Sequence, residues 1–311
     1  MYRELSIHQL LIEQPFHLDL YMEYSDKKKI LFSSSGHIFT SEKRDNILES
    51  GNHCLFIKES DYDKMKEYRS KNIVELLKNP ELTSNERAEL LYESVSDQVY
   101  DMFENGIDKA AVSSSKMYIE SMVTEMMSNR MHSEALLRLT AHDFKTYSHS
   151  VNVSIYALAL GKELRLSEGE MIQLGAGALL HDLGKSKISS KIINKPGKLT
   201  MDEFQEIKKH PDIGYEILKE MGETDEVILN IVKNHHEKLD GSGYGVGLVG
   251  DLIKMEIQIV TVADIFDALT TNRSYKLATS HFTSFKTMKI AMKDQLNMRY
   301  VNTLIKLMGK V

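Results

Sequence analysis

The sequence predicts a mainly α-helical protein that begins with a small α/β module. Three observations support this prediction. From residue 83 onward, apolar residues recur at helical spacing. The first 75 residues instead contain short apolar runs between turn-forming residues. The composition agrees, because only 4 of the 311 residues are proline and 17 are methionine, a flexible side chain that fills irregular helix interfaces.

The strands are expected in the first 75 residues. Three runs have the aliphatic and aromatic side chains typical of strands: Leu20–Tyr24, Lys29–Phe32 and His53–Ile57. Turns rich in Asp, Lys, Ser and Gly separate them. A short helix is expected over Ser41–Leu48 and a second from Tyr62 to about Arg69. We therefore predict a small α/β module over residues 1–75.

A helical connector is expected over residues 76–140. The pattern Thr83-Ser84-Asn85-Glu86 is typical of a capping box, in which a hydroxyl and a carboxylate satisfy free N–H groups at a helix start. A second helix is expected from Asp108 to Arg130, and its methionines are interpreted as packing residues. This connector is a candidate surface for a homodimer or for a signalling protein partner.

Residues 141–311 form the third predicted part. The helical period continues there, interrupted by the loops 195–198 and 240–250. A second capping box begins at Thr200 and opens a helix expected to end near His210-Pro211.

The composition excludes several classes of protein. The chain has 39 basic and 45 acidic residues, whereas binding to duplex nucleic acid requires a basic surface. A single cysteine, Cys54, excludes a disulfide scaffold and a Cys-rich zinc module. The sequence contains no run of about 18 apolar residues, so we expect no membrane span. The first residues lack a secretory signal. We therefore expect a cytoplasmic protein, in which a local basic pocket could still bind a small anion.

Histidine and aspartate carry the chemical signal. Five histidines of the helical half stand at suggestive places: His149, His181, His210, His235 and His236. A single histidine on a helix is more often a packed or exposed residue than a metal ligand. His181-Asp182, however, follows the apolar run 176–180, and Asp264 lies in a second apolar run. Buried acids need partners or a metal, and mixed N/O donors suit iron, manganese, zinc or nickel. These residues predict a metal site inside a helical bundle.

Residues 144–276 resemble the HD-GYP family of bacterial cyclic di-GMP phosphodiesterases, a branch of the HD phosphohydrolases. The matching motifs are His149–Val153, Leu179–Lys185, Asn194–Thr200, His210–Gly214, His235–Gly245 and Val262–Thr270. Their order and spacing follow the family pattern. The resemblance implies an HD-type helical bundle with a metal centre in its core.

The resemblance also implies the ligands of two divalent metal ions, iron first and manganese as the alternative. One ion would be held by His149, His181, Asp182 and Asp264. The other would be held by His210, His235 and His236, with Asp182 bridging both. A hydroxide between two metals is a nucleophile at neutral pH and would attack the phosphodiester phosphorus.

Four residues resemble substrate contacts: Lys185, Arg273, Lys276 and Tyr244. Lys185, which with Asp182 is the predicted catalytic pair, matches a lysine that contacts the scissile phosphate or the hydroxide. Its simpler role is that of a cation near a helix C-terminus. A guanidinium such as that of Arg273 can bind phosphate oxygens through two parallel N–H bonds. Tyr244 could stack on a guanine or pack its own loop, and the sequence leaves both open.

Two positions depart from the family pattern. Gly245 stands where the family has proline, so we expect a more mobile loop. Lys145 stands where some members have a glutamate that binds a third metal. Because an ammonium has no acceptor lone pair, we expect two metals per chain.

The predicted function is metal-dependent hydrolysis of cyclic di-GMP to linear pGpG, and then to GMP. One alternative is a catalytically weak or inactive relative that binds a cyclic dinucleotide or a protein partner. Another is an HD phosphohydrolase that acts on a different nucleotide.

Overall fold

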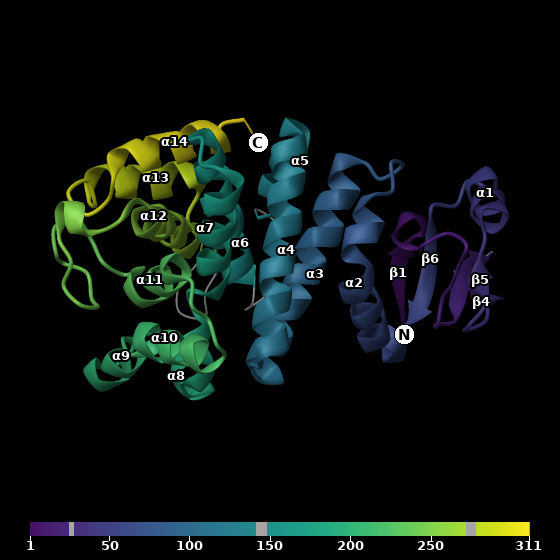
Figure 1. Ribbon diagram of the computed structural model, residues 1–311, viewed down its shortest axis with the longest axis horizontal. Helices are drawn as coiled ribbons and strands as arrows, with labels where there is room; N and C mark the ends of the chain where they lie inside the picture. The colour runs from purple at the N-terminus through teal and green to yellow at the C-terminus, as the bar shows by residue number, and fades with distance from the viewer. Residues whose placement is uncertain (25–27, 141–147, 272–277, 311) are drawn as a thin grey trace. The chain divides into compact units, whose positions relative to one another are not determined.

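The computed structural model describes residues 1–24, 28–140, 148–271 and 278–310, and it divides into two compact units (Figure 1). The first unit is Met1–Ser94 and the second is Val95–Val311. The first holds the strands, and the second is helical. The predicted fold class, a mainly helical protein with a small α/β module at its start, is confirmed. The boundaries predicted at residues 75 and 140 stay a proposal about organisation.

A four-stranded antiparallel sheet forms the first unit. Its order is β1 (Tyr2–Ser6), β6 (Cys54–Lys58), β3 (Leu20–Tyr24) and β4 (Lys28–Ser33). A second, two-stranded sheet pairs β2 (Gln14–Pro15) with β5 (Ile38–Phe39). The three expected strands are present. The sequence did not indicate β1, because on this edge strand only Leu5 is buried and its polar neighbours face outward.

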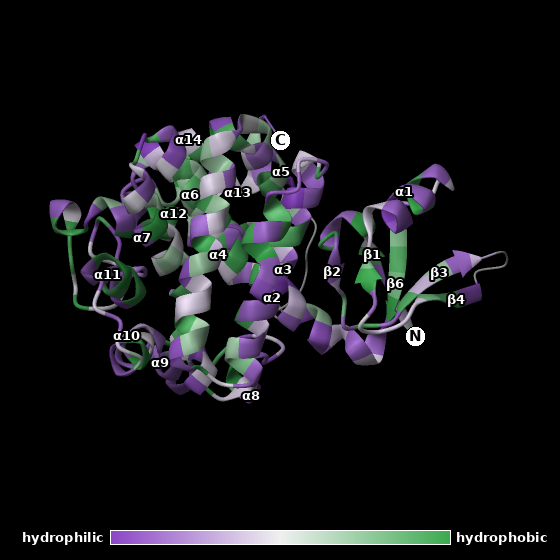
Figure 2. Ribbon diagram, turned by 45° about the vertical axis from the view of Figure 1, so that its right-hand side comes forward, coloured by the Kyte–Doolittle hydropathy of each residue, from purple (hydrophilic) through white to green (hydrophobic). Residues whose placement is uncertain are grey.

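The helices of the first unit cover an apolar core. They are α1 (Ser41–Glu49) and α2 (Tyr62–Leu77), with the short turns η1 (Ile7–Gln9) and η3 (Glu59–Asp61). The core contains Leu5, Ile7, Leu10, Phe16, Leu18, Leu20, Phe39, Ile47, Leu55, Ile57 and Met65. The hydropathy colours agree, because β6 is hydrophobic and α1 is largely hydrophilic (Figure 2).

The helix α2 is longer than expected and does not end near Arg69. Ile73, Leu76 and Leu77 extend its buried stripe by two further turns. Arg69 itself is buried, since its guanidinium pairs with the carboxylate of Glu93 and donates to the Tyr62 hydroxyl at 2.8 Å. A charged residue inside the stripe therefore hid the continuation of the helix.

The second unit consists mainly of long helices. They are α4 (Lys109–Ser128), α5 (Arg130–Leu139), α6 (Ser148–Glu163), α7 (Glu168–Leu180), α10 (His210–Glu220), α11 (Glu226–Asn234), α12 (Met255–Thr270), α13 (His281–Ile290) and α14 (Met298–Met308). Short segments lie between them: η4 (Leu183–Lys187), α8 (Ser190–Ile193), α9 (Met201–Ile207) and η5 (Gly250–Leu252). The helix α3 (Ser84–Glu104) begins in the first unit and ends in the second. α6 is buried on nearly every side, and it packs against α7 and α12 (Figure 1).

Both capping boxes are confirmed. The Glu86 N–H donates to the Thr83 hydroxyl at 3.2 Å, and the Glu86 carboxylate accepts from the Thr83 N–H at 2.9 Å. Thr200 and Glu203 make the same pair of bonds at the start of α9. That helix ends at Ile207, and His210 opens the next helix. Pro211 lies in the first turn of α10, where its missing N–H costs nothing.

A glycine brings η4 against the start of α10. A Cβ built on Gly184 would lie 1.9 Å from the carbonyl oxygen of His210 and 2.6 Å from the N atom of Gly214. No side chain fits in that space, so the two backbones touch. The contact places Asp182, just before η4, beside His210.

Among the helices of the described residues, none combines the length and the apolar character needed to cross a membrane.

Candidate metal centre

Seven side chains converge in the core of the second unit. His149 lies in the first turn of α6, His181 and Asp182 follow α7, and His210 opens α10. His235 and His236 follow α11, and Asp264 lies in α12. They form two groups, Asp182 with His210, His235 and His236, and His149 with His181 and Asp264. Within each group the candidate ligand atoms all lie within 4.8 Å of one another. All seven side chains that the sequence predicted as ligands are thus brought together.

Asp182 lies between the two groups. Its Oδ1 is 3.2 Å from Nε2 of His210 in the first group. Its Oδ2 is 3.5 Å from Nε2 of both His149 and His181 in the second. One carboxylate therefore directs a separate oxygen at each group, which is the arrangement expected of a bridging ligand.

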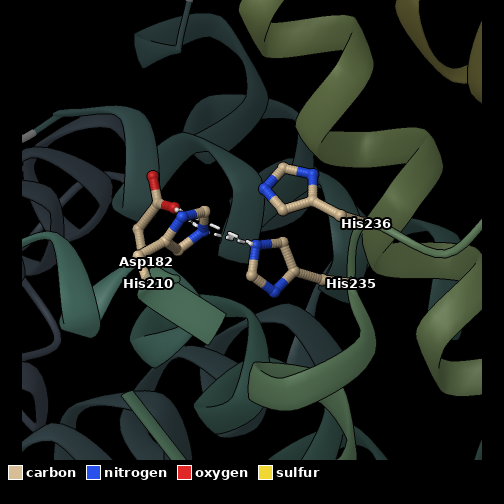
Figure 3. A group of neighbouring side chains, drawn as sticks. All are labelled: Asp182, His210, His235 and His236. Carbon is tan, nitrogen blue, oxygen red and sulfur yellow. Dashed lines mark hydrogen bonds and ion pairs between the residues drawn. The ribbon is translucent and has the colours of Figure 1, made fainter. Parts of the chain in front are cut away.

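The first group is drawn in Figure 3. The rings of His210 and His235 point at each other, with 3.2 Å between their Nε2 atoms. His236 lies beside His235, with 4.1 Å between the ring centroids. In the second group, His149 Nε2 is 3.1 Å from Oδ1 of Asp264. His236 also approaches Asp264, at 3.8 Å, so the two groups are neighbours.

Backbone carbonyls fix the tautomers of three histidines. Nδ1 of His181 donates to the carbonyl of Ala178 at 2.7 Å. Nδ1 of His210 donates to Ile207 at 2.7 Å, and Nδ1 of His235 donates to Val232 at 2.9 Å. In the neutral ring the other nitrogen, Nε2, then carries a lone pair. Three lone pairs are thereby aimed at one small region, as in metal-bound histidines.

Burial favours the neutral form of His181, His235 and His236. His181, His210 and His235 have no exposed surface. Burial lowers the pKa of His181 and lowers that of His235 well below its ordinary value. Burial also lowers the pKa of His236 to about 3. Neutral imidazole is the form that binds a metal.

The two aspartates of the cluster are ionised. Burial raises the pKa of Asp182, but the Lys185 ammonium and the neighbouring histidines outweigh it and hold the pKa well below the ordinary value. For Asp264, burial is outweighed by the neighbouring His149, His236 and His181, so its pKa is also well below the ordinary value. The cluster therefore combines neutral nitrogen donors with carboxylates.

The donor set fits divalent metal ions. The Nε2 atoms of His210 and His235 are 3.2 Å apart, so their lone pairs repel each other. A cation bound to both atoms removes this repulsion. Among the described residues, the buried Nε2 atoms of His181 and His236 have no hydrogen-bond partner. Imidazole and carboxylate together suit iron, manganese, zinc or nickel.

The sequence analysis missed a second layer beneath His149. Asp267 accepts from Nδ1 of His149 at 2.6 Å through Oδ2, and from the amide of Asn152 at 2.9 Å through Oδ1. Neither Asp267 nor Asn152 has exposed surface. Such a carboxylate sets the tautomer and the orientation of a ligating histidine. The available signal was spacing, since Asp267 is three residues after Asp264 on the same helical face.

Of the four predicted substrate contacts, the structure describes two. Lys185 donates to Oδ2 of Asp182 at 2.5 Å, so its ammonium lies at the centre. The Tyr244 ring stacks on His236, with 4.3 Å between the ring centroids, which favours the packing role over stacking on a guanine. Arg273 and Lys276 lie outside the described residues, as does Lys145.

The loop with Gly245 has a conformation that proline cannot adopt. Its φ is +142°, whereas the proline ring fixes φ near −65°. A Cβ on Gly245 would lie 2.7 Å from Oε1 of Glu237, and this same oxygen accepts from the N–H of Gly247 at 2.7 Å. The buried Glu237 carboxylate therefore holds the loop, while the expected mobility stays a prediction.

A cleft opens beside the second group. His149, Asp182 and Lys185 line it, and its volume is about 180 Å³. A ligand in the cleft would reach the metal centre directly.

Comparison with known proteins identifies relatives of the second unit. A family model described as "HD domain" matches residues 124–298. Cyclic di-GMP phosphodiesterase PA4108 of Pseudomonas aeruginosa is 37% identical over 142 residues, 46% of this chain and 34% of that protein. The cyclic di-GMP phosphodiesterase response regulator RpfG of Xanthomonas campestris is 48% identical over 120 residues, 38% of this chain and 32% of that protein.

A third relative has a different substrate in its name. The 3'3'-cGAMP-specific phosphodiesterase 3 of Vibrio cholerae is 39% identical over 133 residues, 43% of this chain and 29% of that protein. The chain therefore matches about a third of the length of these three relatives. Among solved structures, the HDG"Y"P protein Bd1817 of Bdellovibrio bacteriovorus shares the fold. Its TM-score is 0.69 at 21% identity, over 99% of this chain and 100% of that one.

Proposed function

Because the chain belongs to the HD domain family, we propose that it is a metal-dependent phosphodiesterase that hydrolyses a cyclic dinucleotide. Cyclic di-GMP is the preferred substrate, linear pGpG the first product and GMP the second. The resemblance to the HD-GYP phosphodiesterases is confirmed by the relatives of the helical unit. The observation that supports the proposal is the cluster of seven candidate ligands that includes Asp182, with a cleft beside it.

The residues of the chain would divide the work between them. His149, His181, Asp182 and Asp264 would hold one ion, and His210, His235 and His236 the other, with Asp182 shared. When bound, two such ions supply a hydroxide nucleophile and neutralise charge on the phosphoryl oxygens.

Lys185 would bind the scissile phosphate from the Asp182 side of the cleft, where its ammonium already lies. Asp267 would hold His149 in the tautomer that presents Nε2. Arg273 and Lys276 remain our proposal for the second phosphate contact.

The test is reconstitution of the metal-free protein with Fe²⁺ or Mn²⁺ under reducing conditions. We expect hydrolysis of cyclic di-GMP to pGpG, followed by chromatography, and two metal ions per chain by elemental analysis. Iron is the proposed native metal and manganese the alternative. No turnover with either ion would contradict the enzyme assignment, and three ions per chain would contradict the role given to Lys145.

One observation favours a binding protein as the second candidate. With φ of +142° at Gly245, the loop differs from one that carries proline there. If the changed loop has abolished turnover, the metal-loaded protein should bind cyclic di-GMP and leave it intact for hours. Gly245→Pro would test this directly, because it would force the loop out of its present conformation. A gain of turnover would support the binding protein, whereas cleavage by the natural chain would exclude it.

Three further points of organisation are proposals. A regulatory role for residues 1–75 is supported by their separate core. A cytoplasmic location is supported by the single cysteine. A homodimer or a signalling partner is proposed for the connector, and light scattering of the full chain would test the dimer.

A further inference from the structure

His236 differs from the other histidines of the metal centre in how its ring is held. Each of the other four donates through Nδ1, three of them to a backbone carbonyl and His149 to Asp267. For the His236 ring, the described residues supply no hydrogen bond. Its Nδ1 lies 3.8 Å from Oδ2 of Asp264, which is beyond hydrogen-bond distance, and its Nε2 has no partner. Another kind of contact must therefore orient this candidate ligand.

The Tyr244 ring supplies such a contact. It stacks on the His236 ring, with 4.3 Å between the centroids and 27° between the planes. The backbone N–H of Tyr244 also donates to the carbonyl of His236 at 3.2 Å. Two residues of α9 approach the same tyrosine, Phe204 at 6.4 Å between the ring centroids and the Lys208 ammonium at 5.3 Å from the centroid. The tyrosine is thus held by several neighbours, and its ring limits the positions that the His236 ring can take.

Glu237 holds the loop that carries Tyr244. It follows His236 directly in the chain and is only 1% exposed. Its Oε1 accepts from the N–H of Gly247 at 2.7 Å. Gly243 packs so closely that a Cβ there would lie 2.3 Å from the carbonyl oxygen of His236. The loop is therefore attached to the segment 236–237 on both sides of the tyrosine.

We propose that the loop 241–247 is a clasp for His236, in which Glu237 fixes the loop and Tyr244 contacts the ring. Glu237 is then a positioning residue, because it acts on the metal through the loop and does not bind it. The clasp does for His236 what the hydrogen bond at Nδ1 does for the other four histidines. A ring that is already oriented loses less conformational freedom when it binds an ion, so the clasp raises the affinity. This inference rests on the proposed function, in which His236 binds the ion of the first group.

The first test measures the metal affinity of the full chain by competition with a coloured chelator. Glu237→Ala removes the acceptor of the Gly247 N–H and should weaken one of the two ions about 10- to 100-fold, the usual effect of losing a group that orients a ligand. Glu237→Gln keeps an oxygen that can accept, so it should restore most of the affinity. Tyr244→Ala should match Glu237→Ala, whereas Tyr244→Phe keeps the ring and should bind both ions normally. Glu216→Ala, at an exposed position of α10, is the matched control.

A double variant tests whether the two residues act together. Glu237→Ala combined with Tyr244→Ala should weaken the ion no more than either substitution alone, because each already opens the clasp. Additive losses would overturn the proposal, since the two residues would then act independently. Normal affinity in Glu237→Ala, with the helices intact by circular dichroism, would overturn it as well. So would equal loss of both ions, which would indicate general damage to the fold.

A measurement on the metal-free protein separates this inference from the proposed function. The ring current of Tyr244 shifts the NMR resonances of the His236 ring protons, and His236→Gln identifies these resonances by removing them. Glu237→Ala should move them toward the values of a free histidine, and Tyr244→Phe should leave them nearly in place. If they respond in this way but the protein cleaves no cyclic dinucleotide, the clasp stands and the enzyme assignment fails. If cyclic di-GMP is cleaved while the resonances do not respond to Glu237→Ala, the clasp is wrong.

Discussion

The two units of this chain fill their cores in different ways. The described part of the first unit buries aliphatic and aromatic side chains around β6, and its one buried charge, Arg69, has partners in Glu93 and Tyr62. The second unit buries a cluster of histidines and aspartates at its centre: His181, Asp182, His210, His235, Asp264 and Asp267. Unpaired, such groups cost free energy, so the surrounding apolar helices must offset them. The first core is thus apolar, whereas the second core gathers groups that could hold a metal.

The largest expected effect is at Asp182. Asp182→Asn should lower turnover of the reconstituted protein at least about a thousandfold, because a neutral amide is a poor metal ligand and cannot balance two divalent cations. Both metals should be lost in elemental analysis, while circular dichroism shows the helices intact. Asp212→Asn is the matched control, since that carboxylate is exposed on α10. Near-normal metal content in Asp182→Asn would remove Asp182 from the bridging position.

A substitution in the core of the first unit should lower the stability of that unit and leave the metal content unchanged. Leu55 has no exposed surface in β6, and Leu55→Ala should destabilise the first unit by about 2–5 kcal/mol. Hydrogen exchange followed by mass spectrometry should then be faster in peptides of β3 and β6 and unchanged in those of α6 and α12. Metal content should stay normal. Leu31→Ala, at a half-exposed position of β4, is the control. Loss of metal from Leu55→Ala would show that the two cores depend on each other.

A smaller effect is expected one layer away from the ligands. In Asp267→Asn, an amide facing Nδ1 of His149 would favour the tautomer whose Nε2 carries the proton. Metal affinity should fall about 10- to 100-fold, measured by competition with a coloured chelator. Affinity equal to that of the natural chain would mean that the Asp267 contact does not orient His149.

The smallest effect concerns acid stability of the metal-free protein. The pKa of His235 is well below its ordinary value, near 6.5, so below that pH the unfolded chain binds a proton that the folded chain does not. The free energy of unfolding is therefore highest above about pH 6.5. It falls on acidification by up to about 1.4 kcal/mol per pH unit for this histidine.

His235→Gln removes that titration. The slope of the free energy of unfolding against pH, between pH 6.5 and 5, should therefore decrease by the amount that corresponds to about one bound proton. The slope is obtained from urea titrations of the chelator-treated protein, followed by circular dichroism. An unchanged slope would show that His235 is protonated in the folded protein.

The seven residues of the cluster could be named from the sequence because residue type and the family resemblance both point to them. His181-Asp182 after an apolar run, and Asp264 inside another, already indicate buried groups that need a partner. Asp267 and Asn152 could not be recognised in the same way. Their role depends on which side chain packs above them, and Asp267 has the same residue type as many exposed acids.

The elements of the fold also differ in whether a local sequence pattern indicates them. The long amphipathic helices and the capping boxes were predictable because periodicity and caps are local signals. β1 was missed because this edge strand has only one buried residue and therefore no alternating apolar pattern. The end of α2 was missed because Arg69 is buried and pairs with Glu93, which lies on α3. In both cases the information lies in contacts between distant residues, which no local pattern contains.

The contact at Gly184 has a consequence for how this chain can vary. Every base change in a glycine codon that alters the amino acid adds at least a Cβ, and here that atom would lie 1.9 Å from the backbone of His210. Gly184 has no side chain that could bind a metal, yet we expect every single substitution at this residue to be harmful. Distances between a metal and its ligands ordinarily vary by only about 0.2 Å, so a shift of the backbone at His210 would disturb the site. The glycine codon at 184 is therefore under as strong a constraint as the codons of the ligands themselves.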